Sequence, residues 1–272
     1  MKTKKTLIFS FALIICLILS ACSPGNTPGE PVNQSDLNPN LTVTKDPADI
    51  KSFSNSSYEA ANKEQAEQLI GMLGDMFSDP GNFFDSFLNI SPNYRSSSAR
   101  AINPESEIMY LSALSEPPYM IASGYVQYAA TWDDENGFPF LLNGDTKFRV
   151  VFDEFFEEGL GIIGVIAGHG TANINAPSED SISGTVIALY NLAVNLAFTD
   201  PDDESGKTLW AKCIASISVN SNLNSGKVTG SVNIELFGQG NASLAVDSFA
   251  LDIDIEDLFE LLDLFEDGFI II

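Results

Sequence analysis

The sequence predicts a β-dominated α+β fold: a large, curved antiparallel meander sheet with an amino-terminal helical segment and a carboxy-terminal helix. Two observations support this fold class. From about Tyr119 onward, apolar and polar residues alternate along several successive segments, which polar turns join without crossover helices; this is typical of an antiparallel meander. Before and after this region, apolar residues recur instead at helical spacing.

The first 22 residues have the features of an export signal. A basic start precedes an apolar run, Leu7 to Leu19, and a small-residue site, Leu19-Ser20-Ala21-Cys22. The apolar run falls short of the roughly 20 residues that a transmembrane helix needs. The segment closely resembles the signal of bacterial lipoproteins, in which this site is the lipobox. An ordinary cleaved signal and an uncleaved anchor are the alternatives.

The resemblance implies lipidation at Cys22: cleavage before it, a diacylglyceryl thioether on its sulfur and usually acylation of the new amino terminus, for instance with palmitate. Two acyl chains hold a protein on a membrane more stably than one chain does. We therefore expect a cell-envelope protein whose membrane contact is the anchor at Cys22. By the same resemblance, Ser23 is compatible with the outer membrane of a diderm bacterium. In other bacteria we expect the outer face of the cell membrane.

Behind the signal peptide, residues 1–21, the chain divides into a tether and a domain. Residues 22–54 begin with the lipidated cysteine and are rich in Pro, Gly, Asn, Ser and Thr. They predict a disordered tether with a reach of roughly 30 Å. Residues 55–272 are expected to form a single globular α+β domain.

Three segments predict helices. Ser56-Ser57-Tyr58-Glu59 fits a capping box, and apolar residues follow at helical spacing, so a helix is expected over Ser57–Phe77. A second, short helix is expected over Asn82–Ile90, and the carboxy-terminal helix over Glu256–Phe265. Their apolar stripes indicate packing on the sheet, and a groove for a partner helix is the alternative.

The alternating segments predict a sheet with one apolar face and one face rich in Ser, Thr and Asn. The row from Ile182 to Phe198 would extend about 55 Å as a single strand. Either it bends into a hairpin near Asn191, or the sheet is large and strongly curved. Near Asp247-Ser248 the alternation slips by one residue without being lost, which predicts a β-bulge.

The charge balance argues against several classes of partner. The chain holds 13 Lys and Arg against 37 Asp and Glu, a net charge of −24. Binding of nucleic acid demands a basic surface, and so does electrostatic docking on anionic lipid. The acidity is expected to serve solubility, with a cationic ligand or metal as the alternative. Outside the signal and the lipobox only Cys213 remains, so we expect no intrachain disulfide and a thiol that packs as a small hydrophobe.

Two features suggest catalysis, but the residues around each of them do not support it. Gly159-Leu160-Gly161-Ile162-Ile163-Gly164 matches the dinucleotide-binding pattern, but a poor helix former follows it, so a Gly-rich strand or turn is expected. His169 is the only histidine and lies between two glycines. It is expected in a loop or turn rather than as a zinc ligand or a hydrolase base. We assign no catalytic residue and no cofactor.

Two acidic clusters are calcium candidates. Asp200 and Asp202 lie in a segment that departs from an EF-hand loop at its glycine and glutamate positions, so a hairpin turn is the simpler interpretation. Asp252 and Asp254 fall on one side of a predicted strand. There, a bound cation and simple solvation by water are the two explanations for like charges at close spacing.

The sequence favours a non-enzymatic, lipid-anchored envelope lipoprotein that binds a macromolecule or serves a structural or adhesive role. The partner, protein or lipid, is not identified. The first alternative is a carrier of an apolar ligand such as a lipid, in a cavity that helices leave on the apolar face; this is similar in outline to lipoprotein-carrier half-barrels. An exported enzyme and a lipidated membrane β-barrel are the remaining alternatives.

Overall fold

The computed structural model describes residues 38–78, 88–94, 102–113, 120–133, 139–157, 159–178, 181–199 and 206–254. Most of these residues belong to strands, and one α-helix, α2 (Lys63–Ser78), lies among them. The strands are β1 (Glu59–Ala60), β2 (Leu88–Tyr94), β3 (Ile102–Ala113), β4 (Met120–Asp133), β5 (Phe140–Glu157), β6 (Leu160–Ser178), β7 (Ser181–Thr199), β8 (Thr208–Asn222), β9 (Lys227–Phe237) and β10 (Ser243–Asp254). Two short 3-10 helices are η2 (Pro47–Asp49) and η3 (Gln239–Asn241).

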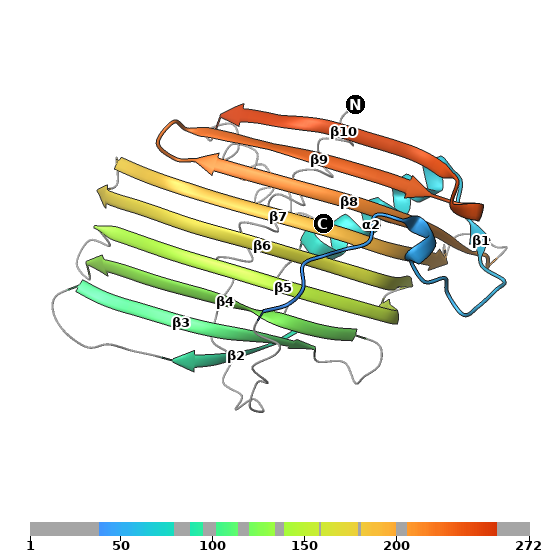
Figure 1. Cartoon of the computed structure of the whole chain (residues 1–272), viewed down its shortest axis with the longest axis horizontal. Coiled ribbons are helices and arrows are strands. Elements are labelled where there is room, and N and C mark those ends of the chain that lie inside the picture. The colour runs from blue at the N-terminus through green and yellow to red at the C-terminus, as the bar shows by residue number, and fades with distance from the viewer. Residues whose placement is uncertain are drawn as a thin grey trace, which may run out of the picture.

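The strands form one ten-stranded sheet in which neighbours along the chain are neighbours in space. From β2 to β10 every neighbouring pair is antiparallel, so the predicted antiparallel meander is confirmed (Figure 1). Only β1 lies off this path. It pairs in parallel with the start of β8, at Leu209 and Trp210, beyond the point where β9 ends. The predicted carboxy-terminal helix, Glu256–Phe265, lies outside the described residues.

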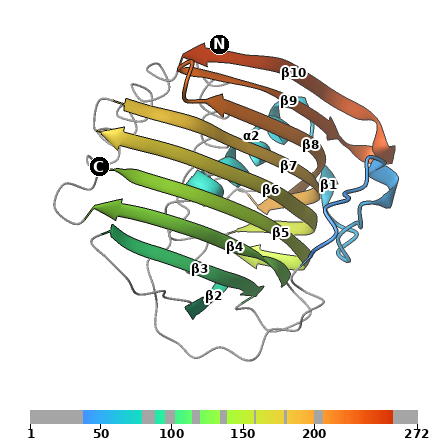
Figure 2. The ribbon, with the colours of Figure 1, turned by 60° about the vertical axis from the view of Figure 1, so that its left-hand side comes forward.

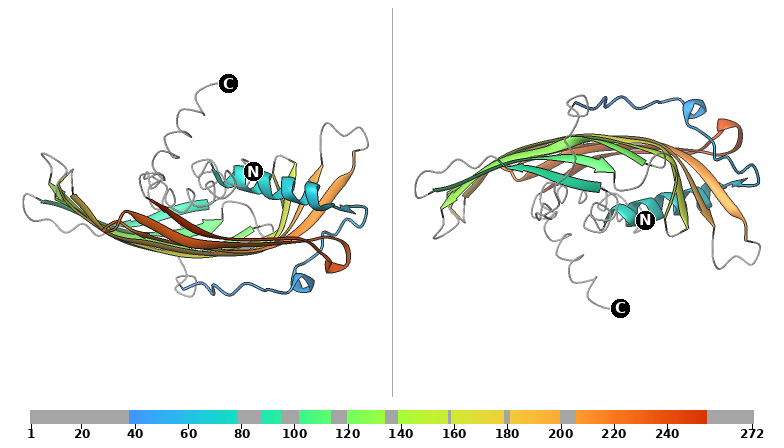
Figure 3. Two further views of the ribbon diagram at one scale, coloured as in Figure 1. Left: turned by 90° about the horizontal axis from the view of Figure 1, so that it is seen from above. Right: turned by 90° about the horizontal axis from the view of Figure 1, so that it is seen from below.

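The sheet is twisted and bent along its strands, which gives it a concave and a convex face (Figures 2 and 3). α2 lies on the concave face, and the segment Asn38–Ser54, which we call the N-terminal strap, lies on the convex face. Successive side chains of a strand point to opposite faces. In β7, for example, Val194 belongs to the core under α2, whereas Asn195 hydrogen-bonds to the strap.

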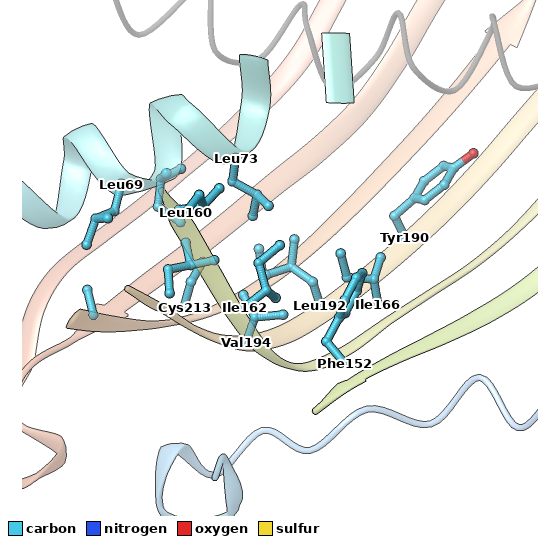
Figure 4. Close-up of a cluster of buried hydrophobic side chains, with 14 of the residues drawn as sticks. Leu69, Leu73, Phe152, Leu160, Ile162, Ile166, Tyr190, Leu192, Val194 and Cys213 are labelled. Carbon is cyan, nitrogen blue, oxygen red and sulfur yellow. The ribbon is translucent and has the colours of Figure 1, made fainter. Parts of the chain in front are cut away.

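The main core lies between α2 and the concave face. Leu69 and Leu73 point from the helix toward Leu160, Ile162 and Val194 of the sheet (Figure 4). All five side chains are at most 3% exposed. Burial of each such side chain stabilises the fold by about 1.5–3 kcal/mol, so the apolar stripe of the predicted amino-terminal helix acts as core.

The helix begins later than the sequence predicts. Asn62, rather than Ser57, is its cap: the Asn62 Oδ1 accepts a hydrogen bond from the backbone N–H of Gln65, and the Gln65 Oε1 accepts one from that of Asn62, both at 3.0 Å. This reciprocal pair is a capping box with amide side chains. The residues before it cannot be helical because Glu59 and Ala60 form β1.

Two further predictions are corrected. Leu88–Ile90, expected at the end of the short helix over Asn82–Ile90, instead begin β2, and the rest of that segment lies outside the described residues. The irregularity of β10 falls between Ser243 and Ala245, whereas Asp247 and Ser248 pair with β9 in unbroken register. At this shift Leu244 and Ala245 both pack against the core. As a result Val246, predicted to continue the apolar row of Leu244, lies on the other face and is 66% exposed.

The long apolar row in the middle of the sequence is a single strand. β7 runs from Ser181 to Thr199 without a hairpin at Asn191, so the sheet is large and curved. Within β6, which pairs with β7, Gly164 has a φ of +136°, and a Cβ there would lie only 2.2 Å from the Ala193 carbonyl oxygen, so the strand requires glycine at this position. The dinucleotide-like motif, Gly159 to Gly164, forms a turn at Gly159 and then the start of β6, as predicted.

Of the tether predicted over residues 22–54, residues 38–54 lie against the sheet, and residues 22–37 lie outside the described residues. The strap is fixed to the convex face in two ways. Polar and cationic side chains of the sheet donate hydrogen bonds to its backbone carbonyl groups, and Phe53 packs in a small apolar cluster with Ile163 and Ala197. A composition rich in Pro, Asn and Thr predicts disorder because it offers little apolar surface to bury. It does not reveal carbonyl groups that side chains of the sheet can bind.

Candidate functional site

The calcium candidates do not form a metal site within the described residues. Asp200 and Asp202 lie outside these residues. Asp252 and Asp254 lie near the end of β10 on the convex face, beside Lys227, whose Nζ is 3.8 Å from the Asp252 Oδ1. In the part of the chain that the structure describes, no group of three or more His, Cys, Asp or Glu side chains could hold a metal ion.

The cysteines have different environments. Cys22, the predicted lipidation site, lies outside the described residues. Cys213 lies in the main core at 1% exposure, and burial raises the pKa of its thiol. A buried, protonated thiol is a poor nucleophile, so the prediction that Cys213 packs as a small hydrophobe is confirmed.

His169 lies within β6 on the convex face, and the prediction of a loop or turn is wrong. Its Nε2 is 3.1 Å from the Oδ1 of Asp145, whose Oδ2 accepts a hydrogen bond from the Tyr125 hydroxyl. Burial and this hydrogen bond raise the pKa of Tyr125 to about 12. Across the sheet, His169 lies between Lys147 and Leu189. Neither of these neighbours offers the hydroxyl nucleophile that a Ser-His hydrolase requires.

Cationic side chains of β5 form hydrogen bonds with the first half of the strap. The Arg149 Nη1 donates hydrogen bonds to the carbonyl oxygens of Asn40, at 2.9 Å, and Thr42, at 2.8 Å. Lys147, two residues earlier on the same face, donates to the side-chain oxygen of Asn38. The strap thus takes up hydrogen-bonding capacity of these two cations.

A bulge in β5 holds the second half of the strap. The register shifts between Phe152 and Phe155, and the bulge residue Glu154 has a φ of +53°. Its carboxylate accepts hydrogen bonds from the backbone N–H and, at 2.8 Å, from the hydroxyl of Ser54. Asp153 beside it lies 2.7 Å from the Lys51 Nζ. The bulge therefore turns two consecutive carboxylates toward the strap.

Lys212 of β8 is the most buried cation of this face, at 5% exposure. Its Nζ donates to the Pro47 carbonyl oxygen at 2.8 Å and to the Asn241 Oδ1 at 3.1 Å. Desolvation lowers the pKa of Lys212, which a nearby carboxylate, Asp46, partly offsets. Three cations of the convex face thus hold the strap.

Part of the convex face beside the strap forms a broad polar surface, which we call the polar field; Lys227 and Glu235 of β9 border it. It consists of the alternate, convex-facing residues of Thr171–Asn175 in β6, Ser183–Asn191 in β7, Ser216–Asn222 in β8 and Thr229–Asn233 in β9. Each of them is Asn, Ser or Thr except Ile187 and Leu189, and all are exposed or half-buried. The field therefore contains no charged side chain.

The two apolar residues lie next to each other on β7, inside the field. Ile187 is 38% exposed and Leu189 is 46% exposed. Across the sheet they are flanked by Thr171 and Asn220 on one row and by His169 and Ser218 on the next. They form a small apolar spot within a surface of amides and hydroxyls.

The concave face remains apolar away from α2. Leu142, Ile174 and Val186 are half-buried there, and Ile182 is 55% exposed. The main core under α2 includes the first residues of β6 and side chains of β7, β8 and β9, but none of these four residues belongs to it.

The sequence predicted a face rich in Ser, Thr and Asn. It did not predict which part of that face forms a continuous uncharged surface. Alternation identifies which side chains share a face. Alternation does not reveal which of these side chains the strap covers, because the sequence of the strap has no periodic pattern from which its position on the sheet could be predicted.

Searches against protein-family models, curated proteins and solved structures found no match to this chain. Among the described residues, no helix combines the length and the apolar character needed to cross a membrane.

Proposed function

We propose that this protein is a non-enzymatic binding module of the cell envelope, anchored by lipid at Cys22, with the polar field as its binding surface. The observation that carries this proposal is the field itself, a broad, exposed, uncharged surface on four adjacent strands. Opposite it, the concave face packs against α2. A rigid sheet suits a binding surface because its side chains need little ordering when a partner docks.

The strap connects the anchor to this face. Since the strap is held from Asn38 onward, the predicted tether shortens to residues 23–37, with a reach of roughly 20 Å instead of 30 Å. It also joins the domain on the convex side, beside Lys147. The polar field would therefore lie close to the envelope layer next to the anchoring membrane, which is the outer membrane if the bacterium is a diderm.

The anchor is tested by Cys22→Ala in the full-length protein. We expect the variant to appear in the soluble fraction of lysed cells, whereas the wild type sediments with membranes and partitions into detergent. If Cys22→Ala remains entirely membrane-bound, the lipoprotein assignment fails. The polar field is tested separately.

A photo-reactive amino acid in place of Leu189 tests whether the field binds a macromolecule in intact cells. We expect a high-mass adduct on illumination. The matched control places the same group at Val246, which is on the same face and 66% exposed but outside the field. Equal adducts at both positions, or none at Leu189, would contradict the field as the binding surface.

A second candidate function is a carrier of an apolar ligand, favoured by the apolar concave residues away from α2, Ile182 among them. Native mass spectrometry of the protein before and after organic extraction distinguishes the two functions. A stoichiometric mass that extraction removes, and that fragments as a lipid, favours the carrier; a bare polypeptide mass favours the binding module.

A further inference from the structure

We propose that the partner of the polar field is an uncharged polysaccharide. This inference rests on the proposed function, because it names the partner of the same surface. It depends on three properties of the field: its lack of charge, its hydrogen-bonding groups, and the apolar pair Ile187 and Leu189.

The charge pattern argues against ionic partners. The chain has a net charge of −24 and 18% charged residues, yet the field holds none. Three cations of this face, Arg149, Lys147 and Lys212, already hold the strap. Lys227 borders the field at Asn222, and the Asp252 carboxylate lies 3.8 Å from its Nζ. Nucleic acids, anionic polysaccharides and anionic lipid headgroups all require cations for affinity. A neutral partner avoids the repulsion that the rest of the chain exerts on anions.

The side chains of the field match the hydroxyl groups of a sugar. Carboxamides and hydroxyls donate and accept hydrogen bonds, as sugar hydroxyls do. On one face of a sheet they repeat about every 4.8 Å across strands and about every 6.7 Å along them. Cross-strand contacts orient several of them: the Asn173 Nδ2 donates to the Asn143 Oδ1 at 2.9 Å, and the hydroxyls of Ser218 and Ser231 are 2.9 Å apart. Such a lattice can bind successive residues of a polymer.

The apolar pair supplies the second element of sugar recognition. The C–H groups of a pyranose ring form an apolar patch between its hydroxyls. Ile187 and Leu189, 38% and 46% exposed, can contact such a patch while neighbouring amides bind the hydroxyls.

A protein partner fits the field less well. Protein interfaces are enriched in aromatic residues, Met and Arg and depleted in Ser, and their energetic centres are mostly Trp, Tyr and Arg. The polar field contains none of the enriched residues. The same composition argues against a second copy of this chain, since both surfaces would lack these centres.

The test is affinity electrophoresis of the full-length protein in detergent, in native gels that contain a soluble polymer. The uncharged probes are hydroxyethyl cellulose, dextran and glycol chitin, and carboxymethyl cellulose is the anionic counterpart of the first. We expect at least one uncharged polymer to retard the protein. We expect the retardation to persist at high salt and carboxymethyl cellulose to have no effect.

Variants locate the binding. Loss of one direct hydrogen bond lowers affinity by about fivefold, so we expect Asn173→Ala and Asn220→Ala each to weaken retardation by about that factor. The double variant Ile187→Ala, Leu189→Ala should weaken it at least as much. Gln68→Ala, which removes an exposed carboxamide of α2, and Val246→Ala are the matched controls and should bind like the wild type. Unchanged urea midpoints would verify that every variant folds.

Three results would overturn the inference: no retardation by any uncharged polymer, retardation only by carboxymethyl cellulose, or field variants that bind like the wild type. The cross-linking at Leu189 separates this inference from the proposed function. An adduct there, without polysaccharide binding, would refute the polysaccharide and leave the binding surface in place.

Discussion

Gly164, within β6, has a φ of +136°. Gly164→Ala adds a Cβ that would lie 2.2 Å from the Ala193 carbonyl oxygen, in a backbone conformation that L-residues rarely adopt. We expect a loss of at least about 3 kcal/mol in the free energy of unfolding, measured by urea denaturation. Gly144→Ala in β5 is the control, because its Cβ would meet its nearest neighbour at 3.6 Å. We expect that variant to be as stable as the wild type. Similar losses in both variants would show that Gly164 is not a special position.

Cys213 provides a prediction for alkaline pH. Burial raises the pKa of its thiol above the ordinary value of 9.0, so above pH 9 the unfolded chain loses this proton while the folded chain keeps it. The unfolded state then binds fewer protons, and the free energy of unfolding falls as pH rises. Cys213→Ala removes this contribution, so the decline between pH 8.5 and 10 should become shallower. Identical slopes in the two proteins would contradict the assignment.

At the scale of single residues, the sequence predicted Cys213 correctly and His169 incorrectly. A cysteine in an alternating apolar row has one favourable environment, the core. The glycines around His169 suggested a turn, but Gly168 has another role: the rings of Phe148 and Tyr190 pack over it, and a Cβ there would lie 2.6 Å from the Phe148 ring. The pattern of residues cannot distinguish a turn glycine from one that makes room for neighbouring rings.

At the scale of elements, the strap depends on Arg149, which bonds two of its carbonyl groups. Arg149→Ala should free the first half of the strap, so that the backbone around Lys45, whose side chain is already exposed, can enter the active site of trypsin. Hydrogen bonds that involve a charged group contribute about 1.5–3 kcal/mol, so we expect cleavage to accelerate by about 10- to 100-fold, followed by gel electrophoresis and mass spectrometry of the fragments.

Lys227→Ala serves as the control for Arg149→Ala, since Lys227 lies on the same face away from the strap. Its cleavage rate should equal that of the wild type. If Arg149→Ala is cut no faster, the strap is held by its other contacts. An unchanged urea midpoint would verify that local release, rather than global unfolding, accounts for faster cleavage.

The elements could be predicted where their own side chains determine them. The apolar stripe of α2 and the alternation of β7 are such cases. The start of α2 could not, because Glu59 and Ala60 belong to a strand pair with β8 that is about 150 residues distant in sequence. The strap was missed for the same reason: its partners, Arg149 and the β5 bulge, are remote residues. For the polar field, the sequence predicted that one face of the sheet is polar. The structure showed which strands of that face carry the uncharged residues.

At the scale of the whole molecule, the net charge of −24 should determine how stability responds to salt. Ion pairs among the described residues, such as Lys207–Glu59 at 3.0 Å and Lys227–Asp252 at 3.8 Å, are exposed and contribute little. Repulsion among the excess carboxylates acts across the whole surface, and salt screens it, since the Debye length is about 10 Å at 0.1 M ionic strength. The urea midpoint should therefore rise between 20 and 500 mM NaCl. A midpoint that falls with salt would mean that ion pairs outweigh this repulsion.

The double variant Asp252→Asn, Asp254→Asn tests the same cause from the opposite direction. It removes two neighbouring carboxylates of the β10 end, where like charges repel, at the loss of one long contact between Asp252 and Lys227. If repulsion dominates, the variant should be at least as stable as the wild type at 20 mM NaCl, and its urea midpoint should respond less to salt. A variant that is less stable at low salt but equal to the wild type at high salt would instead show that Asp252 stabilises the sheet through Lys227. The two outcomes thus distinguish an acidic surface that is tolerated for solubility from one that is organised into ion pairs.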